Sequence, residues 1–293
     1  MWFQSALAVF SSGFSRTRRA QRPQRPRTFR PRLEALEDRC VPAMLNVTSN
    51  LDNGASGTLR SAVAVANASG TPDTIDILTT QTIVLTKGAL SLSHSMTIEA
   101  TAGTATISGG GKSGVFSCIS SSGGIYLTNL NVTDGKATYG GGIYDFGGLI
   151  DLDNCTVSGN SATEGGGIFL TGGPYPGSAG GGHGSMSATS CTFSDNSATY
   201  GGGIYIGADA NEARIITSTL SDNSATYGGG MYIALGTGSA TSFIGSIVSD
   251  NSATSTGGGI DNRSVYAVNV EGDRFFGNSP NNITGPYGGP IVT

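Results

Sequence analysis

The sequence predicts an all-β protein, a single-stranded right-handed parallel β-helix with an N-terminal capping helix. Three observations support this prediction. A fifteen-residue motif recurs as CTVSGNSATEGGGIF (155–169), CTFSDNSATYGGGIY (191–205) and STLSDNSATYGGGMY (218–232), and such repetition is typical of solenoids. Many of the 47 glycines lie in triple runs at fixed offsets. Hydrophobic residues reach 37% against 12% charged residues, a balance that argues against disorder.

The first 43 residues form a separate targeting region, which we expect to be disordered. Residues 16–32 hold eight of the 16 basic residues together with three prolines, and such a segment cannot form a core. The segment LEALEDRCVPA (33–43) follows, and it resembles the N-terminal Leu-Glu-rich sorting tag of planctomycete surface and secreted proteins. This resemblance implies an extracellular or cell-surface location. A basic nucleic-acid-binding arm is the alternative.

Residues 44–293 form the predicted β-helix and carry seven basic and seventeen acidic residues, which disfavours nucleic-acid partners. No apolar run approaches the roughly 18 residues that a transmembrane helix needs, so we expect no membrane-spanning segment. The segment GTLRSAVAVANAS (57–69) predicts the capping helix, with Thr58 as N-cap. Its apolar face consists of Leu59, Ala62, Val63 and Ala66. A helix of this kind shields the apolar end of a solenoid.

Short alternating segments follow the cap, and each predicts a β-strand. They are TIVLT (82–86), SMTIEA (95–100), TATISG (104–109), GVFSCI (114–119) and GIYLTNLNV (124–132). From residue 125 to 285 the pattern becomes a regular repeat of short strand, turn and short strand, with coils expected to stack at about 4.8 Å. The triple glycines lie at 140–142, 165–167, 201–203, 228–230 and 257–259.

Every coil must turn the same corner, which explains why the glycines and an asparagine recur. We expect the glycines to supply positive φ and to allow close contact between coils. We expect the asparagine to adopt the left-handed conformation and to form a hydrogen-bonded ladder along the stack. The ladder residues are Asn160, Asn196, Asn223, Asn251 and Asn278.

The cap, followed by units of hydrophobic-x-x-Asn-Ser-Ala and Gly-Gly-Gly-Ile, resembles a known family over about residues 46–285. This family comprises the right-handed β-helix proteins with the chlamydial-type polymorphic outer-membrane-protein repeat. The resemblance implies a secreted or cell-surface protein with a structural or adhesive role. Autotransporter members end in a membrane anchor of many strands, and since this chain ends in TGPYGGPIVT we expect no such anchor.

A polysaccharide lyase or glycoside hydrolase acting on pectin-type substrates is the alternative function, because such enzymes also use parallel β-helices. Hydrolysis of this kind needs two carboxylates about 5–10 Å apart. His183 lies in a glycine-rich insertion typical of a solvated loop, and His94 has no recognisable partner. The outward row of the central strands carries one carboxylate and consists of Tyr126, Asp151, Ser187, Arg214, Ser242 and Asn269. We therefore predict no catalytic residues.

Two files of aromatic residues are the predicted platform for extracellular glycans or surface proteins. The file after the glycines consists of Tyr144, Phe169, Tyr205 and Tyr232. The file before the glycines consists of Tyr139, Tyr200 and Tyr227, with Glu164 between the first two. The alternative is that these rings cover only one another and the glycine backbone. The sequence does not indicate an oligomeric state.

Cysteines and aspartates also form files. Cys155 and Cys191 share an inward position in consecutive coils, and since their Cβ directions are parallel we expect free thiols. Cys40 lies in the tag, and Cys118 has no assigned partner. A file of outward carboxylates precedes the ladder, formed by Asp195, Asp222 and Asp250. We expect these to be solvated turn residues and expect no cofactor; a calcium site is the alternative.

Overall fold

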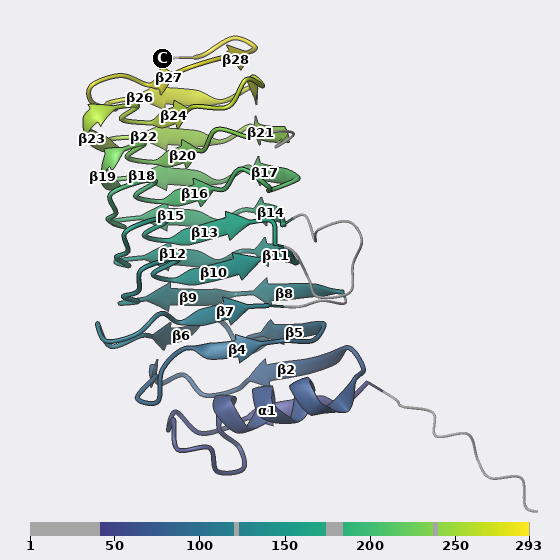
Figure 1. The fold of residues 1–293 in the computed structure, drawn as a ribbon. Coiled ribbons are helices and arrows are strands. Elements are labelled where there is room, and N and C mark those ends of the chain that lie inside the picture. Colours follow the sequence, from purple (N-terminus) through teal and green to yellow (C-terminus); the bar gives the residue numbers. More distant parts are fainter. Residues whose placement is uncertain (1–41, 120–122, 174–183, 237–239, 293) are drawn as a thin grey trace, which may run out of the picture. The chain divides into compact units, whose positions relative to one another are not determined.

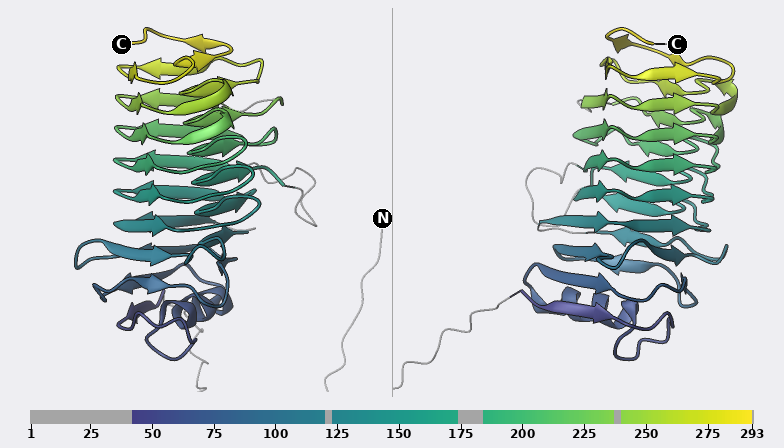
Figure 2. Two further views of the ribbon diagram at one scale, coloured as in Figure 1. Left: turned by 90° about the vertical axis from the view of Figure 1, so that its left-hand side faces the viewer. Right: turned by 180° about the vertical axis from the view of Figure 1, so that it is seen from behind.

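The computed structural model describes residues 42–119, 123–173, 184–236 and 240–292. The predicted targeting region up to residue 41, Cys40 and His183 lie outside these described residues. The described chain winds into a parallel β-solenoid of about eight turns (Figures 1 and 2). Its sheets contain only parallel pairings, so the predicted β-helix is confirmed.

Three long parallel sheets make up the described part of the solenoid. Sheet 1 has ten strands, β1 (Met44–Val47), β2 (Asp73–Ile77), β5 (Met96–Glu99), β8 (Gly124–Thr128), β11 (Leu149–Asp153), β14 (Ser185–Thr189), β17 (Glu212–Ile216), β21 (Ala240–Ile244), β25 (Val268–Glu271) and β28 (Tyr287–Gly288). Sheet 2 has eight strands, β4 (Leu90–Leu92), β7 (Phe116–Cys118), β10 (Ile143–Phe146), β13 (Ile168–Thr171), β16 (Ile204–Ile206), β20 (Met231–Ile233), β24 (Ile260–Asn262) and β27 (Ile283–Thr284).

Sheet 3 follows sheet 1 within each regular coil. It has eight strands, β3 (Ile83–Val84), β6 (Ala105–Ser108), β9 (Leu130–Thr133), β12 (Thr156–Ser158), β15 (Thr192–Ser194), β18 (Thr219–Ser221), β22 (Ile247–Ser249) and β26 (Arg274–Phe276). The segment between the ladder asparagine and the glycines pairs as well. It forms a two-stranded sheet of β19 (Ser224–Tyr227) and β23 (Ser252–Thr256), and isolated parallel bridges in earlier coils. The repeat pattern of the sequence does not predict this fourth strip.

The helix α1 (Leu59–Ser69) lies at the N-terminal end of the solenoid, against β1, β2 and β4 (Figure 1). Thr58 accepts a hydrogen bond from the Ser61 amide, and Gly70 ends the helix with a φ of 69°. The buried residues are those of the predicted apolar face, so the predicted cap is confirmed. In the described residues, α1 has neither the length nor the apolarity of a transmembrane segment.

The glycine corners match their prediction. The first glycine of each triple run has a φ between 57° and 64°. The second glycine contacts the next coil so closely that a Cβ on Gly202 would lie 2.4 Å from the Gly229 carbonyl oxygen. No side chain fits at that distance, so each coil needs glycine at this position.

The prediction of left-handed ladder asparagines is wrong. Positive φ occurs one residue earlier, as at Asp195 (56°) and Asp222 (58°), and this places the asparagine side chain inside the solenoid. A second left-handed corner lies between sheets 1 and 3. Its residues are Asn129, Asn154, Ser190, Thr217, Gly245 and Gly272.

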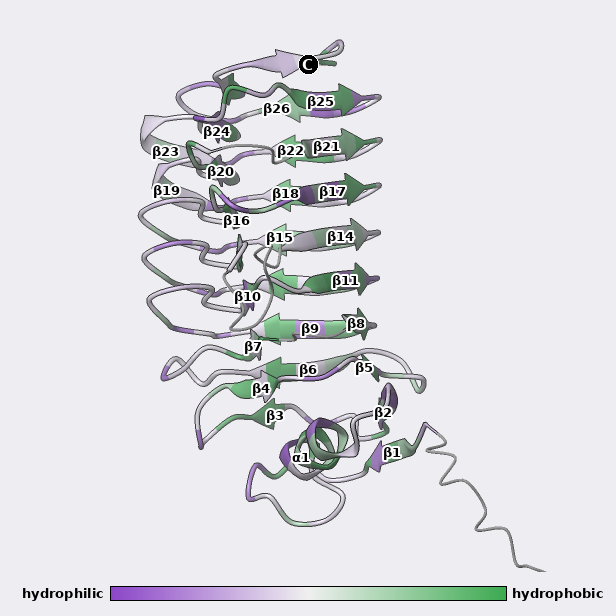
Figure 3. Cartoon of the chain, turned by 45° about the vertical axis from the view of Figure 1, so that its right-hand side comes forward, coloured by the Kyte–Doolittle hydropathy of each residue, from purple (hydrophilic) through white to green (hydrophobic). Residues whose placement is uncertain are grey.

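The core fills the space between the three sheets. Alternate strand residues point into it, as predicted, and Figure 3 shows hydrophobic residues concentrated along the strands. Phe116, Phe193, Phe243 and Phe275 are among its largest fully buried side chains. The residue that follows each triple glycine run is also fully buried, as Ile168 and Ile204 illustrate. The outward side chains of each strand are therefore available to form surface files.

Candidate functional site

The asparagine ladder is continuous and internal. Asn223 donates from Nδ2 to the Phe193 carbonyl and to Asn251 Oδ1, both at 2.9 Å. Its own Oδ1 accepts from the backbone amide of Asn196 at 3.1 Å and from Asn196 Nδ2 at 3.0 Å. The same pattern links the other ladder residues from Asn160 to Asn278. The predicted ladder is confirmed, and since its amides are buried it serves the fold and not a ligand.

A second internal file lies where the coil passes from sheet 1 to sheet 3. Cys155 and Cys191 are buried free thiols there, as predicted. In the following coils, serine hydroxyls accept hydrogen bonds from backbone amides of the preceding coil. Ser218 Oγ accepts from the Cys191 amide at 2.9 Å, and Ser246 Oγ accepts from the Ser218 amide at 3.1 Å. Asp273 ends the file by accepting the Ser246 amide at 2.6 Å. These groups satisfy backbone donors inside the core, so they too are structural.

The outward row of sheet 1 brings its six predicted residues together. The strand register places Asp151 between Tyr126 and Ser187, with Arg214 beyond the serine. Asp151 is therefore the only acid of the predicted six-residue row. Burial and the neighbouring Asp153 raise the pKa of Asp151. The row matches its predicted order, and Asp153 lies two residues along β11 on the same outward face as Asp151.

The aspartate file lies on the outside of the ladder corner. The register of sheet 3 aligns Asp195, Asp222 and Asp250 in successive coils, and all three are exposed. Each one occupies the left-handed turn position, which aspartate tolerates better than most residues. Among the residues described, no group of three or more His, Cys, Asp or Glu side chains is placed to hold a metal ion.

The aromatic file of sheet 2 is a stack of nearly parallel rings. Ring centroids are 5.6 Å apart between Tyr144 and Phe169, 4.9 Å between Phe169 and Tyr205, and 5.5 Å between Tyr205 and Tyr232. The interplanar angles are 14°, 9° and 17°. Phe169 is only 8% exposed, and the three tyrosines are half-buried. The rings thus cover one another, while the half-buried tyrosines still reach the surface.

The second aromatic file packs beside the first. Tyr200 and Tyr227 stack at 5.2 Å, and Tyr200 meets the ring of Tyr232 edge-on at 5.2 Å. Tyr139 lies 5.1 Å from Phe169 and is 47% exposed. The two files therefore form one continuous surface, which we call the aromatic surface. It consists of Tyr139, Tyr144, Phe169, Tyr200, Tyr205, Tyr227 and Tyr232.

Polar groups border this aromatic surface. Glu164 takes the place between Tyr139 and Tyr200. Burial raises the pKa of Glu164, whereas a hydrogen bond from the Tyr205 hydroxyl lowers it. At the C-terminal end, the position after Tyr232 is Asp261, whose carboxylate pairs with Arg263 at 2.7 Å. Hydrogen-bonding groups thus lie along the ring edges and close one end of the surface.

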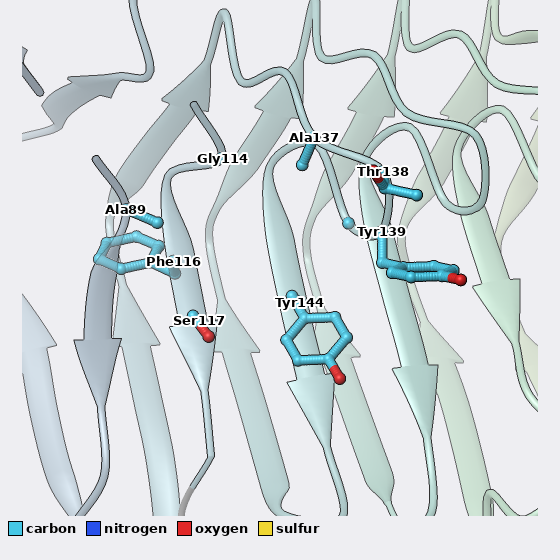
Figure 4. A pocket seen from close by; sticks show the side chains of 9 residues that line it. Ala89, Gly114, Phe116, Ser117, Ala137, Thr138, Tyr139 and Tyr144 are labelled. Atoms are coloured by element: carbon cyan, nitrogen blue, oxygen red, sulfur yellow. The ribbon is translucent and has the colours of Figure 1, made fainter. Parts of the chain in front are cut away.

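The opposite end of the aromatic surface is a groove. It is lined by Ala89, Gly114, Phe116, Ser117, Ala137, Thr138, Tyr139, Gly140 and Tyr144 and has a volume of about 290 Å³. Figure 4 shows Ser117 beside Tyr144 in the neighbouring coil, with the flat of the Tyr144 ring turned to the viewer. Alignment of GVFSCI with GGIYDF would have placed Ser117 one coil before Tyr144 in the file of sheet 2. Only the structure shows that Ala89 and Thr138 line the same groove.

Comparison of the chain with protein-family models, with curated proteins and with solved structures finds no match. The likeness to the polymorphic outer-membrane-protein repeat and to the sorting tag therefore stays a prediction from the sequence.

Proposed function

We propose that this protein is a secreted or cell-surface β-helix that acts as a non-catalytic, adhesive scaffold and binds extracellular glycans through the aromatic surface. The sequence resemblances to the outer-membrane-protein repeat and to the planctomycete tag support the location. The single observation that supports binding is the aromatic surface itself, where seven rings from successive coils lie side by side with Glu164 at their edge.

Glycans fit this surface better than other partners do. Sugars present apolar C–H faces and hydroxyl groups together, which match ring edges that carry phenol hydroxyls and a carboxylate. The body of the protein has ten more acidic than basic residues, seventeen against seven in residues 44–293, and therefore repels acidic polymers. Neutral glycans are the favoured class.

A glycan array tests the proposal. We expect the full chain to bind neutral glycans and the double variant Tyr205→Ala, Tyr232→Ala to lose this binding. Tyr126→Ala is the matched control, because Tyr126 is an exposed tyrosine of sheet 1 remote from both files in the register. Circular dichroism checks that each variant keeps its β structure. Absence of binding by the wild type, or equal binding by the double variant, would refute the proposal.

A screen for turnover tests the non-catalytic part. Acidic and neutral polysaccharides are incubated with the full chain, and reducing ends and unsaturated products are measured. We expect neither product to form. Clear turnover that disappears in Asp151→Asn would favour the lyase or hydrolase alternative.

A further inference from the structure

The aromatic stack of sheet 2 lacks a ring at one position. The register of this sheet aligns Tyr144 with Ser117, and Ser117 with Ser91. On the C-terminal side of Tyr144, each file position up to Tyr232 holds a ring that stacks on the ring of the preceding coil. Phe146 also contacts Tyr144, but it lies two residues along the same strand and not in the preceding coil. In the described residues, no ring therefore occupies the file position next to Tyr144 on its N-terminal side.

The groove occupies this missing position. Its volume of about 290 Å³ is at the lower limit of ligand pockets, which span roughly 300–1,000 Å³, so it suits one ring and not an extended chain. The lining is largely apolar and includes Ala89 and Tyr144, while Ser117 and Thr138 supply hydroxyls. No charged side chain is among the nine lining residues.

We propose that this groove binds a single neutral pyranose residue, which takes the ring position left open by Ser117 and stacks on Tyr144. This inference rests on the proposed glycan-binding function and adds the location and the ligand class. The C–H face of the sugar packs on the Tyr144 ring, and its hydroxyls bind the Ser117 hydroxyl, which lies beside that ring in the neighbouring coil (Figure 4). An acidic sugar is disfavoured because the lining offers no cation for its carboxylate.

The test is an NMR titration of the full chain with methyl glycosides of glucose, galactose and mannose. Glucuronic acid and p-cresol, which mimics a tyrosine side chain, serve as comparison ligands. We expect saturable binding of at least one neutral glycoside with a Kd of about millimolar magnitude, as a ligand of this size allows. Ser117→Tyr fills the open ring position and should weaken this binding at least about tenfold.

Ser187→Tyr is the matched control, because Ser187 is a half-buried strand serine on the outward row of sheet 1. It should bind like the wild type. If Ser117→Tyr loses its β structure, Tyr144→Leu replaces it, since leucine keeps an apolar side chain but removes the ring. Failure of the wild type to bind any neutral glycoside, equal affinity in Ser117→Tyr, or binding of p-cresol alone would each overturn the inference.

The array described above separates the two proposals. If array binding survives in Ser117→Tyr but is lost in the Tyr205→Ala, Tyr232→Ala variant, the groove inference fails and the adhesive function stands. If the glycoside binds in the groove but no glycan on the array is bound, the adhesive function fails.

Discussion

At the scale of single residues, Asn223 illustrates how one amide stabilises several coils. It is fully buried and bonds to Phe193, Asn196 and Asn251. Asn223→Ala leaves these buried partners without hydrogen bonds. Each unpaired buried group lowers the stability of the fold by about 1–3 kcal/mol. We expect a clearly lower melting temperature than for Asn211→Ala, whose asparagine is exposed. Equal melting temperatures of the two variants would refute the ladder's role.

Thr217 has a backbone conformation that is unfavourable for a β-branched residue. Its φ is 46°, a left-handed value that β-branched residues rarely adopt, and its side chain is exposed. Asn129 and Asn154 occupy the same corner in other coils and bond to each other at 2.7 Å. Thr217→Asn should therefore raise the free energy of unfolding by about 1 kcal/mol in urea denaturation. Thr219→Asn, in strand β18, should not stabilise, and a gain of the same size there would contradict the argument.

At the scale of one strand, β10 places a carboxyl in the core. Asp145 is completely buried, and the register places it between Cys118 and Leu170. Burial raises the pKa of Asp145 from 3.8 to about 7, and the amides of Gly148 and Phe146 offset only part of this rise. The folded protein therefore keeps a proton that the unfolded chain releases between pH 4 and pH 7.

The unfolding free energy of the protein should consequently fall as pH rises through this window and level off above about pH 7. The shift corresponds to a penalty of about 4 kcal/mol at high pH. Asp145→Asn removes the titration, so the difference in unfolding free energy between variant and wild type should grow between pH 5 and pH 8. Urea denaturation at both pH values measures it. A pH-independent difference would show that Asp145 does not titrate in this range.

At the scale of the whole molecule, the periodic features were predictable and the single ones were not. The repeat specifies the corner, the ladder and the ring files, because each coil must satisfy the same backbone groups as its neighbours. Asp145 occurs once and breaks the apolar pattern of its file, so no period reveals it. Ser117 likewise matters only because Ala89 and Thr138 lie beside it in space. The predicted position of the left-handed residue was wrong by one, because both Asn and Asp tolerate positive φ.

Residues 44–293 carry seventeen acidic and seven basic residues, and the acidic ones include the exposed file of Asp195, Asp222 and Asp250. Carboxylates about 4.8 Å apart repel by roughly 1 kcal/mol per pair in water. Exposed charges of this kind are screened by any salt, whereas a calcium site would need additional oxygen ligands around the ion. We therefore expect screening, and not a bound cation, to relieve the repulsion along the file.

We accordingly expect calcium and sodium chloride to raise the melting temperature equally at matched ionic strength, because both act only by screening the repulsion along the file. Replacing millimolar calcium with a chelator at constant ionic strength should leave the wild-type melt unchanged. Asp222→Asn removes the middle charge of the file, so this variant should melt higher at low salt and respond less to added salt than the wild type. A stabilisation specific to calcium that disappears in Asp222→Asn would instead establish a calcium site in the file.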